Sequence, residues 1–341
     1  MSLARDVAPH LAVFGIAAAL AITVATREQK KAPTAGREQD VVVWQGRPEA
    51  VSTVRFESKK LTLRLDSRRD DAGRWYVAEV VKTTPAAAAP PAGDGGPAAA
   101  PPPAPEPRKE TSRFVSVGQG DKLVEGLAPM LAYRALGRLE EARAGEFGFD
   151  DPEGTLFVTV SGTEHSLVVG GPTPGGSDRY VKSPASGEVY AVNGETIRSL
   201  QFADSRLIER EVHAFKVEDI DRVRIDRGGQ RRELVRVPDK KDGWADAASP
   251  GALDETSGNW MTKLGRLRAA TYVEKPEGEA TKIVRVEYLE RDKVKGWIEL
   301  HKVAGAQGAE YLVQTEHTRW FGKVTRSAAE SLETDLTSVV K

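Results

Sequence analysis

The chain has 341 residues, of which 40% are hydrophobic and 29% are charged, a composition typical of a globular protein. Its 49 Lys and Arg residues nearly cancel its 50 Asp and Glu residues, so no net field would attract a polyanion and nucleic acid is not an expected partner. Cysteine is absent, which excludes disulfides, thiolate zinc sites, cysteine nucleophiles and a lipid-modified N-terminal cysteine.

The first predicted element is an apolar helix near the N-terminus. Residues 11–25 carry no charge, and the stretch extends to Val7 if Pro9 and His10 are included. We expect a single membrane-spanning helix over about residues 7–25, within an N-terminal anchor of residues 1–31, although a bilayer core usually takes about 20 apolar residues. A cleaved signal peptide and a buried helix of a soluble fold remain as alternatives.

A tract of low complexity interrupts the first half. Residues 85–107 consist almost entirely of Pro, Ala and Gly, with Asp94 and Glu106 as the remaining residues. Such a segment has too little apolar surface to order its backbone by burial, so a disordered, partly polyproline-II spacer is predicted. Loop-closure entropy rises only slowly with length, so the tract is compatible with an insertion into a single domain.

Two segments of the chain resemble each other. Residues 51–77 align without a gap on residues 220–246, and the matched apolar positions are Val54 with Val223, Phe56 with Ile225, Leu65 with Leu234, and Trp75 with Trp244. Both segments read as two alternating strands joined by a charged turn and followed by a tryptophan. The pattern predicts an internal repeat, residues 40–212 and 213–341, with the Pro/Ala tract inserted in the first copy.

Each copy continues with the same kinds of elements. A helix is expected from Asp121, as N-cap, through Leu136 in the first copy, and around Trp260, Leu264 and Leu267 in the second. Strands follow at residues 155–160 and 282–289, then a hairpin and a short final helix. The predicted order is β-β-helix-β-β-β-helix, twice. This is an α+β fold of mainly antiparallel sheet with helices packed on one face, and whether both copies share one sheet stays open.

Gly171 and Gly176, in a glycine-rich loop, have the spacing of a phosphate-binding loop. Ser177 and Asp178 stand where the motif requires Lys and Ser or Thr, and alternating strands follow instead of a helix. The second copy has a comparable loop without Pro, with Tyr311 aligned on Tyr180 and Phe321 on Tyr190. The loop is therefore predicted to be a hairpin turn.

No other motif indicates a chemistry. The five histidines form no metal-ligand pair, and no catalytic, cofactor-binding or metal-binding residue is predicted. Alternation with Val223, Ile225 and Leu234 predicts that most of the arginines between residues 222 and 236 lie on the outer face of a sheet. The surface expected to bind a partner comprises Tyr180, Tyr190, Tyr311, Trp320, Arg224 and Arg232.

The residues after the first helix resemble the signature of the DUF4340 family. The resemblance rests on Phe147-Gly148-Phe149, Pro152, Val169-Gly170, Tyr180-Val181 and Val189-Tyr190, and it extends over most of residues 40–341. Phe147 and Phe149 replace the commoner Tyr and Leu of the family. The resemblance implies no catalytic residue, since the family has none established, and it implies an envelope protein encoded beside ABC transporters of the gliding-motility type.

These observations together lead to a functional expectation. We expect a non-catalytic accessory or scaffold protein of an ABC-type transport or motility complex, anchored in the inner membrane with its globular part in the periplasm and acting by protein–protein binding. The alternatives are an envelope module that binds cell-wall glycan or another ligand through exposed aromatic residues, and a hydrolase with an unrecognised site. No cofactor is expected.

Overall fold

The computed structural model describes residues 40–84, 108–238, 240, 242–305 and 308–341. The expected anchor helix at about residues 7–25 and the Pro/Ala tract lie outside this part of the chain. Within the described residues, no helix is long and apolar enough to cross a membrane.

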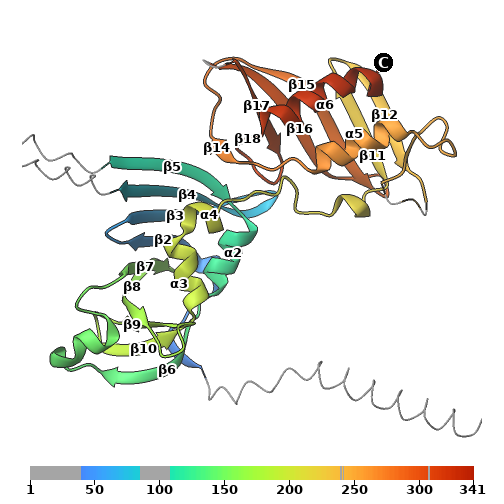
Figure 1. The fold of residues 1–341 in the computed structure, drawn as a ribbon. Coiled ribbons are helices and arrows are strands. Elements are labelled where there is room, and N and C mark those ends of the chain that lie inside the picture. The colour runs from blue at the N-terminus through green and yellow to red at the C-terminus, as the bar shows by residue number, and fades with distance from the viewer. Residues whose placement is uncertain (1–39, 85–107, 239, 241, 306–307) are drawn as a thin grey trace, which may run out of the picture. The chain divides into compact units, whose positions relative to one another are not determined.

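The strands form two sheets in which the pairings are mainly antiparallel (Figure 1), so the α+β expectation is confirmed. The first sheet has ten strands in the order β1-β6-β10-β9-β8-β7-β2-β3-β4-β5. They are β1 (Val41–Trp44), β2 (Val51–Glu57), β3 (Leu61–Asp70), β4 (Gly73–Thr84), β5 (Arg108–Ser116), β6 (Met130–Arg138), β7 (Gly154–Val160), β8 (Thr163–Pro172), β9 (Arg179–Lys182) and β10 (Glu188–Val192).

The second sheet has eight strands in the order β13-β12-β11-β15-β16-β17-β18-β14. They are β11 (Arg222–Arg227), β12 (Gln230–Arg236), β13 (Trp244–Asp246), β14 (Thr271–Val273), β15 (Ala280–Glu290), β16 (Lys293–Gly305), β17 (Gly308–Thr315) and β18 (Phe321–Lys323). The helices are α2 (Gly118–Glu125), α3 (Gly194–Gln201), α4 (Ala203–Arg206), α5 (Glu255–Gly265) and α6 (Arg326–Val339), with short 3-10 turns η1 (Pro48–Ala50), η2 (Glu141–Phe147) and η3 (Val217–Asp219).

The two sheets share one strand order. From β6 to β4, the first sheet has the order β6-β10-β9-β8-β7-β2-β3-β4. The second sheet, from β14 to β13, has the order β14-β18-β17-β16-β15-β11-β12-β13, so each strand of one list corresponds to the strand at the same place in the other. The matched apolar positions are also paired alike, because Val54 lies opposite Leu65 and Val223 lies opposite Leu234. The sequence similarity between the two segments thus has a counterpart in topology and register.

Each half contains more strands than the sequence pattern indicated. The tryptophans Trp75 and Trp244 lie on a third strand, β4 or β13, and β6 or β14 follows the first helix. The Pro/Ala tract connects β4 to β5, whose ends Thr84 and Arg108 are paired, so it joins two strands of one hairpin.

Helices cover one face of the second sheet (Figure 1). The core between them contains Val223, Ile225, Val284, Val286 and Ile298 from the strands, and Trp260, Leu264, Leu332 and Leu336 from α5 and α6. Burying such side chains contributes about 1.5–3 kcal/mol each. No helix of the described residues covers the opposite face of the strands. That face carries the polar residues that alternate with the core residues along each strand.

The expected length of the first helix is wrong. Helix α2 ends at Glu125 and residues 130–138 form strand β6. Gly126 follows the helix and Pro129 lacks the N–H that a helix would use, so the leucine spacing continues as a strand. Asp121 is not an N-cap but accepts hydrogen bonds from Arg74 Nε and Tyr76 Oη, both at 2.9 Å.

The glycine-rich loop is a hairpin turn, as predicted. It joins β8 to β9, which pair antiparallel, and Gly176 N–H donates to Thr173 O at 2.8 Å. Gly175 and Gly176 have φ values of 101° and 76°, a left-handed conformation that glycine adopts without steric cost.

Candidate functional site

The outer face of the second sheet, formed by β12, β11, β15 and β16, gathers the polar side chains that alternate with the core. Arg224 and Asp226 alternate with Val223 and Ile225 in β11. In the same way Arg285 and Glu287 alternate with Val284, Val286 and Tyr288 in β15. Directly opposed residues of paired strands share a face, so these side chains form one continuous surface, which we call the charged face.

Opposite charges oppose each other across the strands of the charged face. Asp226 lies opposite both Arg231 and Arg285, and its Oδ2 accepts a hydrogen bond from Arg231 Nε at 2.9 Å. Arg224 lies opposite Glu287. Each such pair contributes about 0.2–1 kcal/mol relative to alanine, so the alternation stabilises the sheet while its outer face stays polar.

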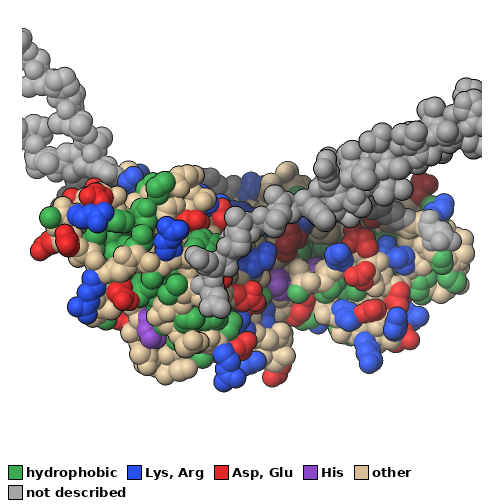
Figure 2. Space-filling view, turned by 90° about the horizontal axis from the view of Figure 1, so that it is seen from below, with side chains coloured by type: hydrophobic (Ala, Val, Ile, Leu, Met, Phe, Trp, Pro, Cys, Tyr) green, Lys and Arg blue, Asp and Glu red, His purple; other side chains and the backbone are tan. Residues whose placement is uncertain are grey.

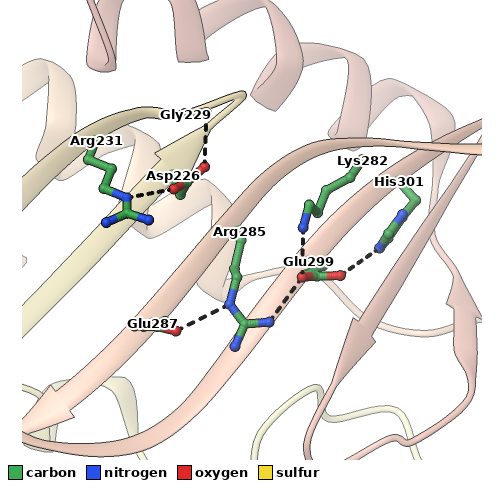
Figure 3. A network of polar contacts seen from close by, with 8 residues as sticks. All are labelled: Asp226, Gly229, Arg231, Lys282, Arg285, Glu287, Glu299 and His301. Atoms are coloured by element: carbon green, nitrogen blue, oxygen red, sulfur yellow. Dashed lines mark hydrogen bonds and ion pairs between the residues drawn. The ribbon is translucent and has the colours of Figure 1, made fainter.

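One carboxylate near the middle of this face has several partners (Figure 3). Arg285 Nη1 and Lys282 Nζ donate to Glu299 Oε1 at 3.0 and 3.3 Å, and His301 Nε2 lies 3.1 Å from Oε2. Burial acts to raise the pKa of Glu299, but the hydrogen bonds from Arg285 and Lys282 lower it below its usual value. Burial lowers the pKa of His301 against the influence of Glu299, so the imidazole is neutral at neutral pH.

An aromatic ring and a hollow complete the charged face. Trp297 lies opposite Glu287 and is partly exposed, and the guanidinium of Arg285 is 4.6 Å from its ring centroid. A hollow of about 550 Å³ lies on the neighbouring strands, lined by Arg224, Ile225, Asp226, Arg231, Arg232, Glu233, Arg285 and Glu287. On the face of the molecule that Figure 2 shows, Lys and Arg side chains are interspersed with Asp and Glu, without an extended region of one sign.

The aromatic residues expected to bind a partner do not form a surface. Tyr190, Tyr311 and Trp320 are only 6%, 2% and 7% exposed. Tyr311 Oη donates to a carboxylate of α6, Glu333, and so faces the helices. Large apolar rings gain more free energy by burial than by exposure, and a single strand pattern does not reveal which of its faces is covered.

The aligned tyrosines of the two hairpins are also not equivalent. Tyr180 is partly exposed and neighbours Val181, which lies opposite buried Val169, so Tyr180 points to the other face of the sheet. Its ring contacts Phe147 edge-on, with centroids 4.9 Å apart. Tyr311 instead points to the helix-covered face.

The two arginines of the expected surface lie on opposite faces. Arg224 is on the charged face with its side chain 49% exposed, as expected. Arg232 is on the helix-covered face, where it donates to Asp246 Oδ2 at 2.9 Å, Asp254 Oδ2 at 2.7 Å and Val339 O at 2.7 Å. It therefore holds β12 against the start of α5 and the end of α6, and it reaches the charged face only where it lines the hollow.

The surroundings of several acidic residues keep them in the charged form. Every carboxyl group in the described residues with a resolved pKa shift has its pKa lowered, Glu209, Asp254 and Glu333 among them. Such groups are carboxylates at neutral pH rather than proton donors. In the same part of the chain, no three His, Asp or Glu side chains are grouped closely enough to hold a metal ion.

A tight backbone contact explains one sequence signature of the first half. A Cβ added to Gly170 would lie 2.3 Å from Phe147 O. Gly148 has a φ of 74°, and a Cβ added to it would lie 2.5 Å from the backbone nitrogen of Gly171. The Lys182 ammonium lies 5.2 Å from the Phe149 ring centroid. Residues 147–149 thus pack directly onto the end of β8, and small residues are required where the two backbones meet.

The comparison with family models agrees with this signature. Residues 120–284 match the family described as Domain of unknown function (DUF4340). No curated protein and no solved structure matches the chain. The matched segment runs from α2 into β15 and contains each of the signature residues at positions 147–190. The match supports the resemblance to the DUF4340 family over this segment of the chain.

Proposed function

We propose that the protein is a non-catalytic binding protein that acts as an accessory or scaffold subunit of an ABC-type transport or gliding-motility complex. In this proposal the N-terminal segment anchors it in the inner membrane and the folded part lies in the periplasm. The charged face is the surface that would bind the partner subunit.

The observation that carries the binding role is the composition of the charged face. It combines a partly exposed tryptophan, Trp297, an arginine stacked on that ring, Arg285, and a hollow beside them. Trp and Arg are the residue types that most often dominate the energetics of protein interfaces, and the surrounding charged pairs would form a polar rim. A partner with alternating charges would find complementary groups along the strands.

The glycan-binding alternative has less support. Trp244 and Trp320 are buried and cannot stack on a sugar ring, which leaves Trp297 as its basis on the second sheet. The carboxyl groups of the described residues with a resolved pKa shift all have it lowered, which does not favour the hydrolase alternative.

Site-specific cross-linking in native membranes tests the proposed surface. A photo-reactive phenylalanine analogue at Arg224, on the charged face, is expected to cross-link to a transport subunit, because this side chain projects into solvent there. The same analogue at Arg143, an exposed residue of η2 in the first half, is the matched control and is expected to give no such product. Mass spectrometry would identify the cross-linked protein.

A double substitution gives an independent measure of the same surface. Arg224→Ala with Arg231→Ala removes two exposed charges and is expected to reduce recovery of the partner at least fivefold in affinity purification, whereas Arg143→Ala should not. Equal recovery of the partner by the unchanged protein, the double variant and Arg143→Ala would exclude the charged face as the partner-binding surface. Recovery of the protein alone from native membranes, without a transport subunit, would contradict the scaffold role.

A further inference from the structure

A second hollow lies beside helix α5, away from the charged face. This recess has a volume of about 390 Å³ and is bounded by the segment leading into β11 and by the C-terminal half of α5. Its apolar wall consists of Phe215, Val217, Trp244 and Met261. The volume falls within the range of about 300–1,000 Å³ typical of small-molecule sites. The residues that line it all lie in the family-matched segment 120–284.

The side chain of Arg236 is fixed at this recess. Its Nε donates to Ile220 O and its Nη2 to Val217 O, both at 2.6 Å. The guanidinium carbon is 4.6 Å from the centroid of the Trp244 ring. A guanidinium has five N–H groups, so the two bonds to carbonyls leave three, including both on Nη1. The orientation is thus set by the fold while part of the donor fork stays available.

No counter-ion in the described part of the chain contacts Arg236. Burial lowers the pKa of its guanidinium, with Asp242 and Glu218 acting against this only from a distance. A half-buried cation without a paired anion costs free energy, which a bound anion would offset. Fixed arginines of this kind are the usual anchors for carboxylates.

The remaining charges at the recess indicate the charge of the occupant. Arg268 Nε pairs with Glu211 Oε1 at 3.1 Å, but among the described residues neither Lys216 nor Arg266 has an ion-pair partner. With Arg236 and Arg268, four cationic side chains line the recess against three carboxylates, Glu211, Glu218 and Asp242. An excess of one positive charge fits a single carboxylate better than a doubly charged phosphate.

We propose that this recess binds the carboxylate of an organic anion with an apolar body, and that Arg236 is its anchor. The carboxylate would accept hydrogen bonds from the free N–H groups of Arg236, and the apolar body would lie against the partly exposed Phe215 and Val217. The same chemistry can come from a free carboxylic acid or from the C-terminal carboxylate of a polypeptide that ends in an apolar residue.

Titration of the full chain with sodium benzoate tests the site. The indole N–H signals of the six tryptophans are followed by NMR, with Trp244 assigned from the variant Trp244→Phe. A saturable shift of the Trp244 signal is expected with benzoate and not with benzamide, which has the same ring without the charge. Equal shifts with both probes would overturn the role of the carboxylate.

Two substitutions with opposite expected effects test the anchor. Arg236→Met is expected to weaken benzoate binding at least tenfold, because a charge-assisted pair is lost. Glu218→Gln removes an exposed negative charge from the rim and is expected to tighten binding about two- to fivefold. The control Arg143→Met, at an exposed arginine of η2 in the first half, should bind benzoate like the unchanged protein.

These variants also separate a failed fold from a failed proposal. The five other indole signals report whether Arg236→Met remains folded. If it does not, Glu218→Gln decides, and unchanged affinity in that variant overturns the proposal.

A short peptide with a C-terminal phenylalanine that binds more tightly than benzoate, and loses binding when amidated, would assign the site to a polypeptide end. Weaker binding of the peptide would assign it to a free acid.

Discussion

Replacing Arg232 by Met is expected to lower the free energy of unfolding by about 2–3 kcal/mol, somewhat less than the ~3–5 kcal/mol lost when a fully buried ion pair is broken. The Arg232 side chain is 23% exposed, and its guanidinium joins Asp246, Asp254 and the carbonyl of Val339. Met keeps much of the apolar stem but leaves both carboxylates without this partner. Asp254 is also the N-cap of α5, so the start of that helix would loosen.

The loss should depend on pH. The backbone N–H of Ala248 and the guanidinium of Arg232 lower the pKa of Asp246, and for Asp254 burial opposes a lowering by Ser257 and Arg232. Carboxyl groups with a lowered folded pKa stabilise the fold above their unfolded pKa of about 3.9, and this stability is lost as pH falls through the folded value. The difference between the two proteins should therefore be largest near neutral pH and shrink below about pH 4.

Arg231→Met is the matched control, because this neighbouring side chain is 83% exposed and has a single ion pair, with Asp226. Its cost should stay within about 0.5 kcal/mol. Urea unfolding of the full chain, followed by circular dichroism at several pH values, measures both variants. Equal midpoints for the two variants at neutral pH would show that Arg232 does not hold the helices to the sheet.

The contrast between Arg231 and Arg232 also shows which part of a residue's placement the strand pattern predicts. Residues two apart on a strand share a face, so Arg232 belongs with buried Leu234 and Arg231 belongs with the outer face. The alternation thus indicates that Arg232 lies on the covered face, and the prediction that it belongs to a partner-binding surface conflicts with this pattern. The partners of Arg232 on α5 and α6, by contrast, depend on tertiary packing that no local pattern contains.

Other features of the fold likewise divide into those that the sequence predicts and those that it does not. The hairpin after Gly170 and the strands at residues 155–160 and 282–289 follow from glycine chemistry and alternation, and the structure has all of them. The helix expected to reach Leu136 fails because leucines spaced for a helix also fit a strand once Gly126 and Pro129 intervene. The recess at Arg236 was not predictable, since it joins three segments whose proximity only the fold establishes.

A second large effect is expected for Gly170→Ala, which should lower the free energy of unfolding by about 2–4 kcal/mol through overpacking. The added Cβ would meet Phe147 O at 2.3 Å and two ring carbons of Phe149 at 2.8 and 3.0 Å. The nearest of these atoms belongs to the backbone, which cannot rotate away as a flexible side chain can. Either β8 or the turn at residues 147–149 must move.

Gly171→Ala provides the control on the adjacent residue. Its Cβ would meet nothing closer than 3.6 Å, an ordinary contact, so the change should stay within about 0.5 kcal/mol. Both substitutions remove a similar amount of chain entropy from the unfolded state, so this contribution cancels in the comparison. Urea midpoints of the two variants isolate the backbone contact, and similar midpoints would mean that the Phe147–Gly170 approach is not what requires glycine there. A large difference would show that this part of the DUF4340 signature encodes a close packing of backbones rather than a ligand site.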